Sequence, residues 1–466
     1  MKGANSYRSM VIWKIRGGAC LISPLLNHKK GAFLYPLPCH RSTKSFNPLG
    51  GRNMSELHVA LLGFGTVGQG VYEALDTHRE RIKDITGKEV RIRAILIKDP
   101  SKEREIDPSI KVTTDFDEIL EEEDIDVLFE AIVGEEPGYT YLTKAIERGI
   151  HVVTANKAMF ASKGEDLLTR AREREVAVGF EATTAGGLPV IGAIRQLLNV
   201  NEITHIQGIL NGTSNFILSQ MRKEGLSFER ALSIAQEKGY AEADPTSDVG
   251  GQDAFYKLMI LSRAAFHGQP DWEAVPKKGI TDLTSDWLQA AESFSLRFKH
   301  VGSIQRDRES ISGVVEPVLV KESHPFYGVE DVENVVSVKG SLVGRFTLSG
   351  PGAGKLPTGS AMVEDFLSLI EGRYASSETR ARIGVESLSG RDGEWVVRTP
   401  DEALPEWVDR FDLLDRITLS GHLYLFIRGN EEEWNAVQQA DVRLQPYPVL
   451  KELPLESRLK REASVR

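Results

Sequence analysis

The sequence predicts an α/β protein whose first domain is a doubly wound parallel sheet, and three observations lead to this fold class. A short apolar strand near residue 60 runs into a glycine-rich turn and then a helix. Strand and helix patterns alternate from there to about residue 190, as in sheets built from strand–helix–strand units. The chain has 466 residues, of which 41% are hydrophobic. This is enough for a large core and for two or three domains.

The glycine-rich turn is "GFGTVG", which directly follows the apolar run at residues 59–62. Val67, Val71 and Leu75 then recur at helical spacing. Between a strand and a helix, the pattern G-x-G-x-x-G indicates a Rossmann-type dinucleotide site, in which the pyrophosphate lies on the helix N-terminus. A glycine turn with a purely structural role is the alternative. The predicted contact residues are Gly63, Phe64, Gly65, Thr66, Val67 and Gly68.

The second strand, "VRIRAILIKD" at residues 90–99, leaves the choice of cofactor open. Asp99 at its end suits the ribose 2′-hydroxyl of NAD. Lys98, Lys102 and Arg104 crowd the same turn and suit the 2′-phosphate of NADP. A solvated charged loop is the third interpretation.

Further strands are expected at residues 124–132 ("DIDVLFEAI") and 151–160 ("HVVTANKAMF"), with a helix between them that Gly149 closes. Beyond Gly192 the pattern changes toward an α+β region. There "ITHIQGILNGTSNFILSQM" reads as a strand, a polar loop and a helix. A capped helix follows at residues 227–239. Polar stretches near residues 300–310 and 389–405 are predicted connections, and "GEWVVRTP" and "ITLSGHLYLFIRG" are predicted strands of a folded tail.

The formal net charge is -10, and this acidic balance argues against a nucleic-acid partner. No run of about 20 apolar residues exists that would span a membrane. Residues 1–55 contain no Asp or Glu, and they hold both cysteines, Cys20 and Cys39. We therefore exclude residues 1–53 from the fold. They are a mis-assigned start ahead of Met54, a targeting segment or an arm. The thiol-free remainder fits a reducing compartment, and we expect a cytoplasmic protein.

The run "GYAEADPTSDVGGQDAFYKLMIL" places one lysine, Lys257, among apolar residues and one helical turn after Asp253. A lysine in an apolar environment has a lowered pKa, which suits a general acid/base near neutral pH. The alternative is snorkelling, in which the stem packs and the amine reaches water. Lys157, expected at a strand end where ligands of α/β sheets gather, is a second candidate, although such lysines are also commonly just solvated.

Six motifs in this order resemble the homoserine dehydrogenase family over residues 57–375: "GFGTVG", "TANKA", "EATTAGGLP", "NGTSNFIL", "GYAEADPTSDVGGQDAFYKL" and "GAGKLPTGSA". Glu135 stands where many relatives have a glycine. The resemblance implies reversible, NAD- or NADP-dependent interconversion of L-homoserine and L-aspartate 4-semialdehyde. A semialdehyde dehydrogenase is excluded because it needs a nucleophilic cysteine, and residues 57–466 contain none. A non-catalytic dinucleotide-binding regulator is the alternative function; it would tolerate loss of Asp253 and Lys257, and both are present.

The resemblance also implies the roles of individual residues. Catalytic roles fall to Lys257, Lys157 and Asp253. Substrate contacts fall to Glu242, Asp253, Gly212, Thr213, Tyr240 and Asp248. The cofactor set adds Lys98, Asp99, Lys157, Gly354 and Thr358 to the glycine turn. A sodium or potassium ion would lie on Glu181, Thr184, Gly186 and Leu188.

The implied domains are an extension at residues 1–53, a dinucleotide-binding domain at 54–185 and a substrate-binding and dimerisation domain at 186–340. Residues 341–375 would return to the nucleotide-binding domain. Residues 376–466 would form a C-terminal region with a regulatory role as one interpretation, and this region lacks the opening usual for the ACT-type domain of many bacterial relatives. The resemblance further implies a homodimer or homotetramer that acts on a small molecule.

Overall fold

The computed structural model describes residues 12–14, 20–22, 55–121, 124–197, 199–307, 310–373 and 392–453. The chain divides into two units, Met1–Ser45 and Phe46–Arg466. In the first unit, β1 (Ile12–Lys14) and β2 (Cys20–Ile22) pair antiparallel. The remainder of the extension predicted at residues 1–53 lies outside the described residues.

The first sheet of the larger unit has six parallel strands in the order β5-β4-β3-β6-β7-β8. Their bounds in that order are Lys111–Thr113, Glu89–Leu96, Glu56–Leu62, Val127–Glu130, His151–Thr154 and Val178–Gly179. Counted along the chain from β3, this is the 3-2-1-4-5-6 order of dinucleotide-binding sheets. The predicted α/β fold class is therefore confirmed.

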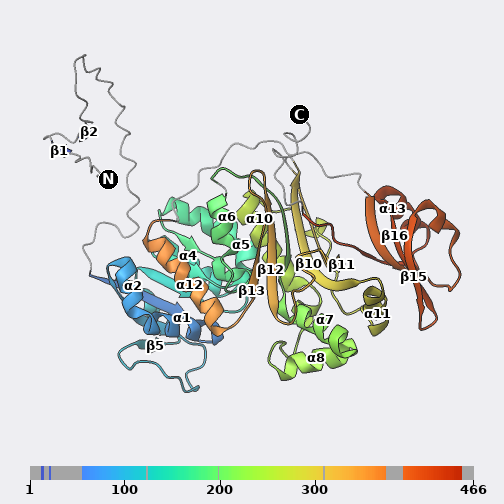
Figure 1. Ribbon diagram of the computed structural model, residues 1–466. Helices are drawn as coiled ribbons and strands as arrows, with labels where there is room; N and C mark the ends of the chain where they lie inside the picture. Colours follow the sequence, from blue (N-terminus) through green and yellow to red (C-terminus); the bar gives the residue numbers. More distant parts are fainter. Residues whose placement is uncertain are drawn as a thin grey trace, which may run out of the picture. The chain divides into compact units, whose positions relative to one another are not determined.

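The connections of this sheet are mostly helical, and a helix from far along the chain joins them. The helices are α1 (Thr66–Thr77), α2 (Arg79–Thr86), α3 (Phe116–Glu121), α4 (Gly138–Glu147) and α5 (Lys157–Glu173). Figure 1 shows the orange α12 (Lys355–Ile370) beside the blue α1. A Cβ atom on Gly70 would lie 2.0 Å from the Lys355 carbonyl oxygen, and one on Gly359 would lie 2.5 Å from the carbonyl carbon of Gly70. Glycines thus allow the two helices to touch backbone to backbone.

The second sheet is antiparallel, with the order β11-β10-β9-β12-β13. Its strands, in that order, are Ser310–Lys321, Leu296–Asp307, Ile203–Ile209, Glu333–Gly340 and Gly344–Pro351. The helices of this region are α6 (Val190–Leu197), α7 (Gly212–Glu224), α8 (Phe228–Glu237), α9 (Thr246–Val249), α10 (Gln252–Phe266) and α11 (Ser285–Ser293). Helix α8 is capped by Ser227, as predicted, and Gly239 follows its end with φ 74°.

The connection predicted near residues 300–310 is wrong, because β10 continues through residues 300–307. Half-buried Ser303 and Gln305 alternate with buried Ile304, since one face of an antiparallel strand packs on the core while the other meets more polar surroundings, and the polar His300 is itself buried. A polar composition alone therefore does not mark a loop here.

The C-terminal residues form a third sheet with the order β15-β16-β14-β17. Its strands, in that order, are Asp412–Leu419, His422–Asn430, Asp392–Arg398 and Gln445–Pro448, and α13 spans Glu431–Ala440. The tail predicted to fold does so among these residues, and the connection predicted at residues 389–405 is wrong where β14 occupies it. The predicted strand "ITLSGHLYLFIRG" is two strands, which turn at Ser420 (φ 50°) and Gly421 (φ 76°).

The connectivity of the third sheet is that of a split β-α-β unit in which the short 3-10 helix Glu406–Arg410 replaces the first long helix. This sheet packs on α11 of the substrate region. The ring of Trp287 lies edge-on to Tyr424 at 5.0 Å and to Tyr447 at 4.8 Å, measured between ring centroids. No helix among the described residues is long and apolar enough to cross a membrane.

Candidate active site

The predicted acid–lysine pair lies at the start of α10, where both side chains are buried. Asp253 is 2% exposed, and the Lys257 Nζ lies 2.9 Å from its Oδ2 atom one helical turn later. The same ammonium donates a hydrogen bond to the carbonyl oxygen of Leu210 at 2.7 Å. The Lys257 side chain is only 9% exposed, so its amine does not snorkel into water. The snorkelling interpretation is therefore excluded for this conformation.

Lys157 reaches the same carboxylate from the nucleotide-binding sheet. Its Nζ forms an ion pair with the Asp253 Oδ1 atom, and its side chain is 46% exposed. The strand predicted at residues 151–160 is wrong in its second half, because β7 ends at Thr154 and Lys157 is the first residue of α5. Asn156 causes this change, since its side-chain oxygen accepts a hydrogen bond from the Met159 N–H and caps the helix.

The two lysines differ in electrostatic environment. Burial lowers the pKa of Lys257, and the charge of Asp253 offsets part of this effect. The charge of Asp253 raises the pKa of Lys157, and the charges of Asp248 and Glu242 add to it. Burial alone would raise the pKa of Asp253, but the two ammonium groups outweigh it and hold that pKa far below its usual range. Lys257 is therefore the lysine whose proton is easier to remove.

Asn211 organises the carboxylates around this pair, and we did not predict a role for it. Its Nδ2 donates to Asp248 Oδ1 at 2.7 Å and to Asp253 Oδ2 at 2.9 Å. Its Oδ1 accepts from the Ser214 N–H and so caps α7. The signal was available, because Asn211 opens the motif "NGTSNFIL". Burial raises the pKa of Asp248, and the Asp253 charge adds to this.

The other predicted substrate residues lie around this core, where α7 and the loop before α9 approach each other. The Thr213 hydroxyl donates to the Tyr240 carbonyl oxygen at 2.7 Å. A Cβ atom on Gly212 would lie 2.8 Å from the Val332 carbonyl oxygen, so only glycine fits there. Tyr240 is 44% exposed, and Glu242 is exposed as well. The structure thus brings Glu242, Tyr240, Gly212, Thr213 and Asp248 together with the acid–lysine pair.

The glycine turn has the geometry that the sequence predicts. Gly63 adopts φ 95°, and a Cβ atom there would lie 2.8 Å from the Ala131 carbonyl oxygen. A Cβ atom on Gly68 would lie 2.1 Å from the Gly63 carbonyl oxygen, so this glycine lets the helix pack closely on the turn. Gly65 is the exposed N-cap of α1, and a Cβ atom there would meet no atom within 4 Å. The start of α1 is therefore open to a ligand. Phe64, Thr66 and Val67 complete the turn.

The remaining predicted cofactor residues flank this turn. Lys98 and Asp99 follow β4, and Asp99 accepts hydrogen bonds from the Ser101 hydroxyl and N–H that lower its pKa. Gly354 is the N-cap of α12, and its carbonyl oxygen accepts from the Thr358 N–H. Since α12 packs on α1, Gly354 and Thr358 stand on the helix that neighbours the glycine turn.

The predicted cation loop lies between the first sheet and α6. The two carboxylate oxygens of Glu181 accept hydrogen bonds from the N–H groups of Ile191 and Gly192, at 2.7 and 2.6 Å. Burial raises the Glu181 pKa to about 7, and the nearby charge of Asp365 adds to this. Thr184, Gly186 and Leu188 follow in the same loop, with Gly186 at φ 55°. The described residues contain no cluster of three His, Cys, Asp or Glu side chains that would hold a metal ion.

A buried carboxyl at the end of β6 is a second group that we did not predict. Glu130 is fully buried, and it accepts hydrogen bonds from the Thr154 hydroxyl at 2.5 Å and from the Ile132 N–H at 2.7 Å. Burial raises its pKa to about 7. Asn156 links it to the loop that follows, through a bond to the Gly134 carbonyl oxygen at 2.6 Å. In that loop Glu135 accepts from the Ser162 hydroxyl of α5.

Comparison with known proteins agrees with this geometry. A family model described as "Homoserine dehydrogenase, NAD binding domain" matches residues 63–181, and one described as "Homoserine dehydrogenase" matches residues 189–367. The chain is 37% identical over 367 residues to the homoserine dehydrogenase of Bacillus subtilis, covering 78% of this chain and 83% of that protein.

Solved structures give the same result. The crystal structure of a homoserine dehydrogenase from Thiobacillus denitrificans is similar with a TM-score of 0.76 and 31% identity, covering 85% of this chain and 99% of that chain. A hyperthermophilic archaeal homoserine dehydrogenase in complex with NADPH is similar with a TM-score of 0.58 and 25% identity, covering 67% and 97% of the two chains.

Proposed function

The chain belongs to the homoserine dehydrogenase family, and from this premise we propose that Lys257 exchanges the proton of the reaction while Asp253 and Lys157 hold the substrate beside it. The enzyme is an oxidoreductase that interconverts L-homoserine and L-aspartate 4-semialdehyde. The observation that carries the residue assignment is the buried Lys257 ammonium, 2.9 Å from Asp253 and 9% exposed. Family membership rules out the alternative of a non-catalytic regulator.

Oxidation of an alcohol requires a group that takes the hydroxyl proton while the hydride leaves. Lys257 supports this role because burial lowers its pKa toward the range in which the amine is neutral. In the reverse direction the ammonium donates the proton to the carbonyl oxygen of the semialdehyde. A bound dinucleotide supplies or accepts the hydride.

The other charged groups suit the substrate's fixed charges. Lys157 is half exposed and keeps a raised pKa, so it stays charged and offers hydrogen bonds to the substrate or cofactor. Exposed Glu242 would bind the substrate ammonium group, as the family resemblance implies. Gly212, Thr213, Tyr240 and Asp248 would shape the pocket between these charges.

For the cofactor we propose NAD or NADP on the glycine turn, with Asp99 and Lys98 at the adenosine ribose. Gly354 and Thr358 would cover the bound cofactor. Two observations bear on the ribose. Asp99 offers a carboxylate acceptor, whereas Lys102 and Arg104 line a pocket in the same loop and suit a phosphate. The archaeal relative binds NADPH. The test measures kcat/KM with NADP and with NAD, in wild type and in Arg104→Ala. If Arg104 binds the 2′-phosphate of NADP, its loss lowers the NADP value alone. If the ratio of the two values does not change, NAD is the cofactor that the loop fits.

We also propose a sodium or potassium ion on the loop of Glu181, Thr184, Gly186 and Leu188. Glu181 and Asp365 are two buried carboxyl groups whose charges interact unfavourably, and a nearby cation would relieve this. Hard cations take carboxylate and carbonyl oxygens of this kind. A thermal midpoint that rises in sodium or potassium chloride but not in choline chloride would support the site. Equal midpoints in all three salts would reject it.

We also propose that the protein forms a homodimer or homotetramer and that it is located in the cytoplasm. Light scattering of the purified protein measures the first, and the location of a tagged full-length chain measures the second.

The central test compares three lysine-to-methionine variants, which keep the bulk of the stem. Lys257→Met should lower kcat about 10²–10⁴-fold, the usual contribution of a proton-transfer group, while the Kd for the dinucleotide stays within twofold. Lys157→Met should also weaken dinucleotide or substrate binding. Lys163→Met, on the same helix as Lys157 but packed over Tyr139, is the matched control and should change neither value. Wild-type turnover by Lys257→Met in both directions would move the catalytic assignment to Lys157.

A further inference from the structure

The carbonyl oxygen of Leu210 receives two hydrogen bonds, and only one of them comes from the lysine. The Lys257 Nζ donates at 2.7 Å, and the Nδ2 of Asn334 donates at 3.0 Å. We propose that Asn334 is a positioning residue, which shares this carbonyl with Lys257 and so fixes the direction and strength of the lysine's hydrogen bond. The inference rests on the role proposed above for Lys257.

Among the described residues, the Asn334 side chain makes no other hydrogen bond. It is fully buried, and its Oδ1 atom has no hydrogen-bond partner among the described residues. A buried amide oxygen without a partner costs free energy, so the donor bond to Leu210 is what the asparagine provides here. The amide packs closely against the backbone of Gly352. A Cβ atom on Gly352 would lie 2.1 Å from the Asn334 Cγ and Oδ1 atoms, so only glycine leaves room for the amide there. The amide is therefore held in one place.

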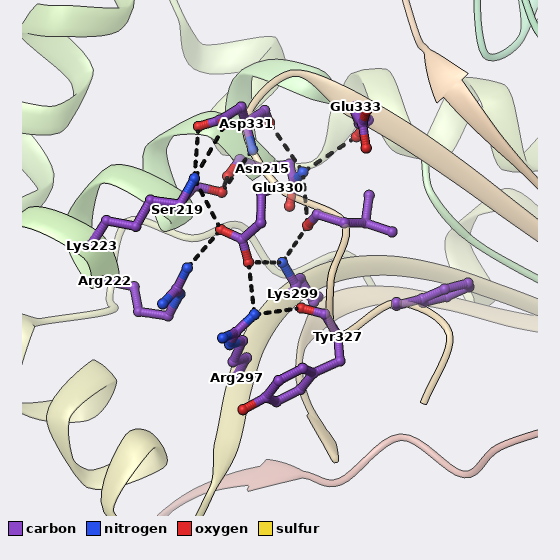
Figure 2. Close-up of polar contacts among 12 residues, drawn as sticks. Asn215, Ser219, Arg222, Lys223, Arg297, Lys299, Tyr327, Glu330, Asp331 and Glu333 are labelled. Carbon is purple, nitrogen blue, oxygen red and sulfur yellow. Dashed lines mark hydrogen bonds and ion pairs between the residues drawn. The ribbon is translucent and has the colours of Figure 1, made fainter. Parts of the chain in front are cut away.

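The segment that leads into Asn334 is clamped by side chains from α7 and β10, as Figure 2 shows. Asn215 of α7 donates to the carbonyl oxygens of Asp331 at 3.0 Å and Glu333 at 3.3 Å. The Ser219 hydroxyl accepts from the Asp331 N–H at 3.0 Å. Backbone groups within four residues of Asn334 are thus tied to α7.

Glu330 holds the beginning of the same segment through four basic side chains, and the most distant of them is Lys223 at 3.6 Å (Figure 2). Its carboxylate lies 2.8 Å from Arg222, 3.1 Å from Lys299 and 3.3 Å from Arg297. Helix α7 begins two residues after Leu210. The same helix therefore fixes the segment before Asn334 and the chain next to the carbonyl that Asn334 binds.

The other groups that act on Lys257 are charged, which makes the neutral amide distinct. Asp253 on α10, Asp248 on α9 and Lys157 on α5 each act on the lysine through their charges. His300 on β10 is buried near Asp253, with its pKa lowered by burial to about 4, so it is neutral when the enzyme works. Asn334 adds no charge. It competes with the ammonium for one acceptor, and so limits how strongly that acceptor favours the charged form of Lys257.

The decisive variant is Asn334→Leu, which keeps the volume and removes the amide. With its competitor gone, the Leu210 carbonyl binds the ammonium more strongly, and the charged form of Lys257 is favoured. Since oxidation needs the neutral amine, the acid limb of kcat for homoserine oxidation should move to higher pH. We expect a shift of about 0.5–1 pH unit, because a hydrogen bond to a charged group is strengthened only in part. Below the limb this equals a further three- to tenfold loss of kcat.

The matched control is Ser337→Ala on the same strand, which is buried and bonds the Thr347 hydroxyl at 2.7 Å. It should alter stability without moving the limb. An acid limb in Asn334→Leu within 0.2 pH units of wild type overturns the inference, whatever happens to kcat, and so does an equal shift in Ser337→Ala. If Asn334→Leu is insoluble, Asn334→Ala replaces it, since it also removes the donor to Leu210 without adding a charge and should shift the limb in the same direction.

Lys257→Met separates this inference from the proposed function. If that variant keeps wild-type turnover, the catalytic role of Lys257 fails. If it loses turnover while the acid limb of Asn334→Leu stays in place, only the role of Asn334 fails.

Discussion

Replacing Glu330 by glutamine should cost about 3–5 kcal/mol of stability at pH 7, because it leaves a buried ammonium without its counter-ion. Lys299 is 2% exposed, and its Nζ lies 3.1 Å from Glu330 and also bonds the Val329 carbonyl oxygen. Arg222 keeps a contact with Glu292 and Arg297 keeps one with the Tyr327 carbonyl oxygen, so the main loss falls on Lys299.

The pKa values give the size of the effect. Burial alone would raise the pKa of Glu330, but Lys299 and Arg222 lower it from 4.5 to about 2. This favours the ionised form by about 3 kcal/mol, a contribution present above pH 4.5 and lost as the pH falls toward 2. Burial lowers the pKa of Lys299 from 10.5 to about 8, which is a cost of about the same size for its charged form below pH 8. The attraction between the two groups therefore offsets part of the burial cost of each, and removing one partner exposes the cost of the other.

The assay is urea unfolding at pH 7, followed by tryptophan fluorescence, on a double-mutant cycle. Glu330→Gln alone should lower the free energy of unfolding by the amount above. Glu330→Gln combined with Lys299→Met should recover at least about 2 kcal/mol of it, since no buried charge is then left unpaired. A loss below about 1 kcal/mol for Glu330→Gln, or the same loss in the presence of Lys299→Met, would refute the reasoning.

Three further predictions follow from particular contacts. Burial raises the Glu130 pKa from 4.5 to about 7, so the stability that protonated Glu130 contributes is fully present below pH 4.5 and is lost as the pH rises through 7. In Glu130→Gln, the thermal midpoint should therefore depend less on pH between 4.5 and 7. Tyr447→Ala should cost about 3–5 kcal/mol in unfolding, because it uncovers Trp287, while kcat stays unchanged. A chain that begins at Met54 should keep wild-type kcat, because β3 and the glycine turn are complete in it; its loss of soluble, active enzyme would contradict this.

The parts of the site that the sequence predicted are those in which partners are close along the chain. The glycine turn lies between one strand and one helix, and Asp253 and Lys257 are one turn apart on α10. Spacing alone places such groups on one face. The bond from Asn334 to Leu210 joins residues 124 positions apart, and no local pattern encodes it. It depends on how β12 lies beside β9.

The wrong predictions also have physical causes. The strand expected at residues 151–160 was extended too far, because the cap formed by Asn156 starts a helix within an apolar run. The loops expected at residues 300–310 and 389–405 contain parts of β10, β11 and β14, in which polar and buried apolar residues are mixed, so a polar composition did not distinguish them from connections. Glu130 was passed over because a carboxyl inside an apolar run looks like an irregularity in a strand. Its burial and its three hydrogen-bond donors became visible only when β6 and β7 were side by side.

One carboxylate joins the two halves of the proposed catalytic site. Lys157 begins a helix of the nucleotide-binding sheet, Lys257 belongs to a helix of the substrate region, and both ammonium groups contact Asp253. When Lys257 is charged, these three groups carry one net positive charge, and when it gives up its proton they carry none. If Lys257 exchanges the proton as proposed, oxidation would begin with the second state, in which the positively charged oxidised nicotinamide of a bound dinucleotide would meet the least repulsion. It would end with the first state, when that ring is reduced and neutral. On this proposal the charge of Asp253 links proton transfer at Lys257 to the redox state of the cofactor, and the burial of Asp253 and Lys257 limits the screening of that link by water.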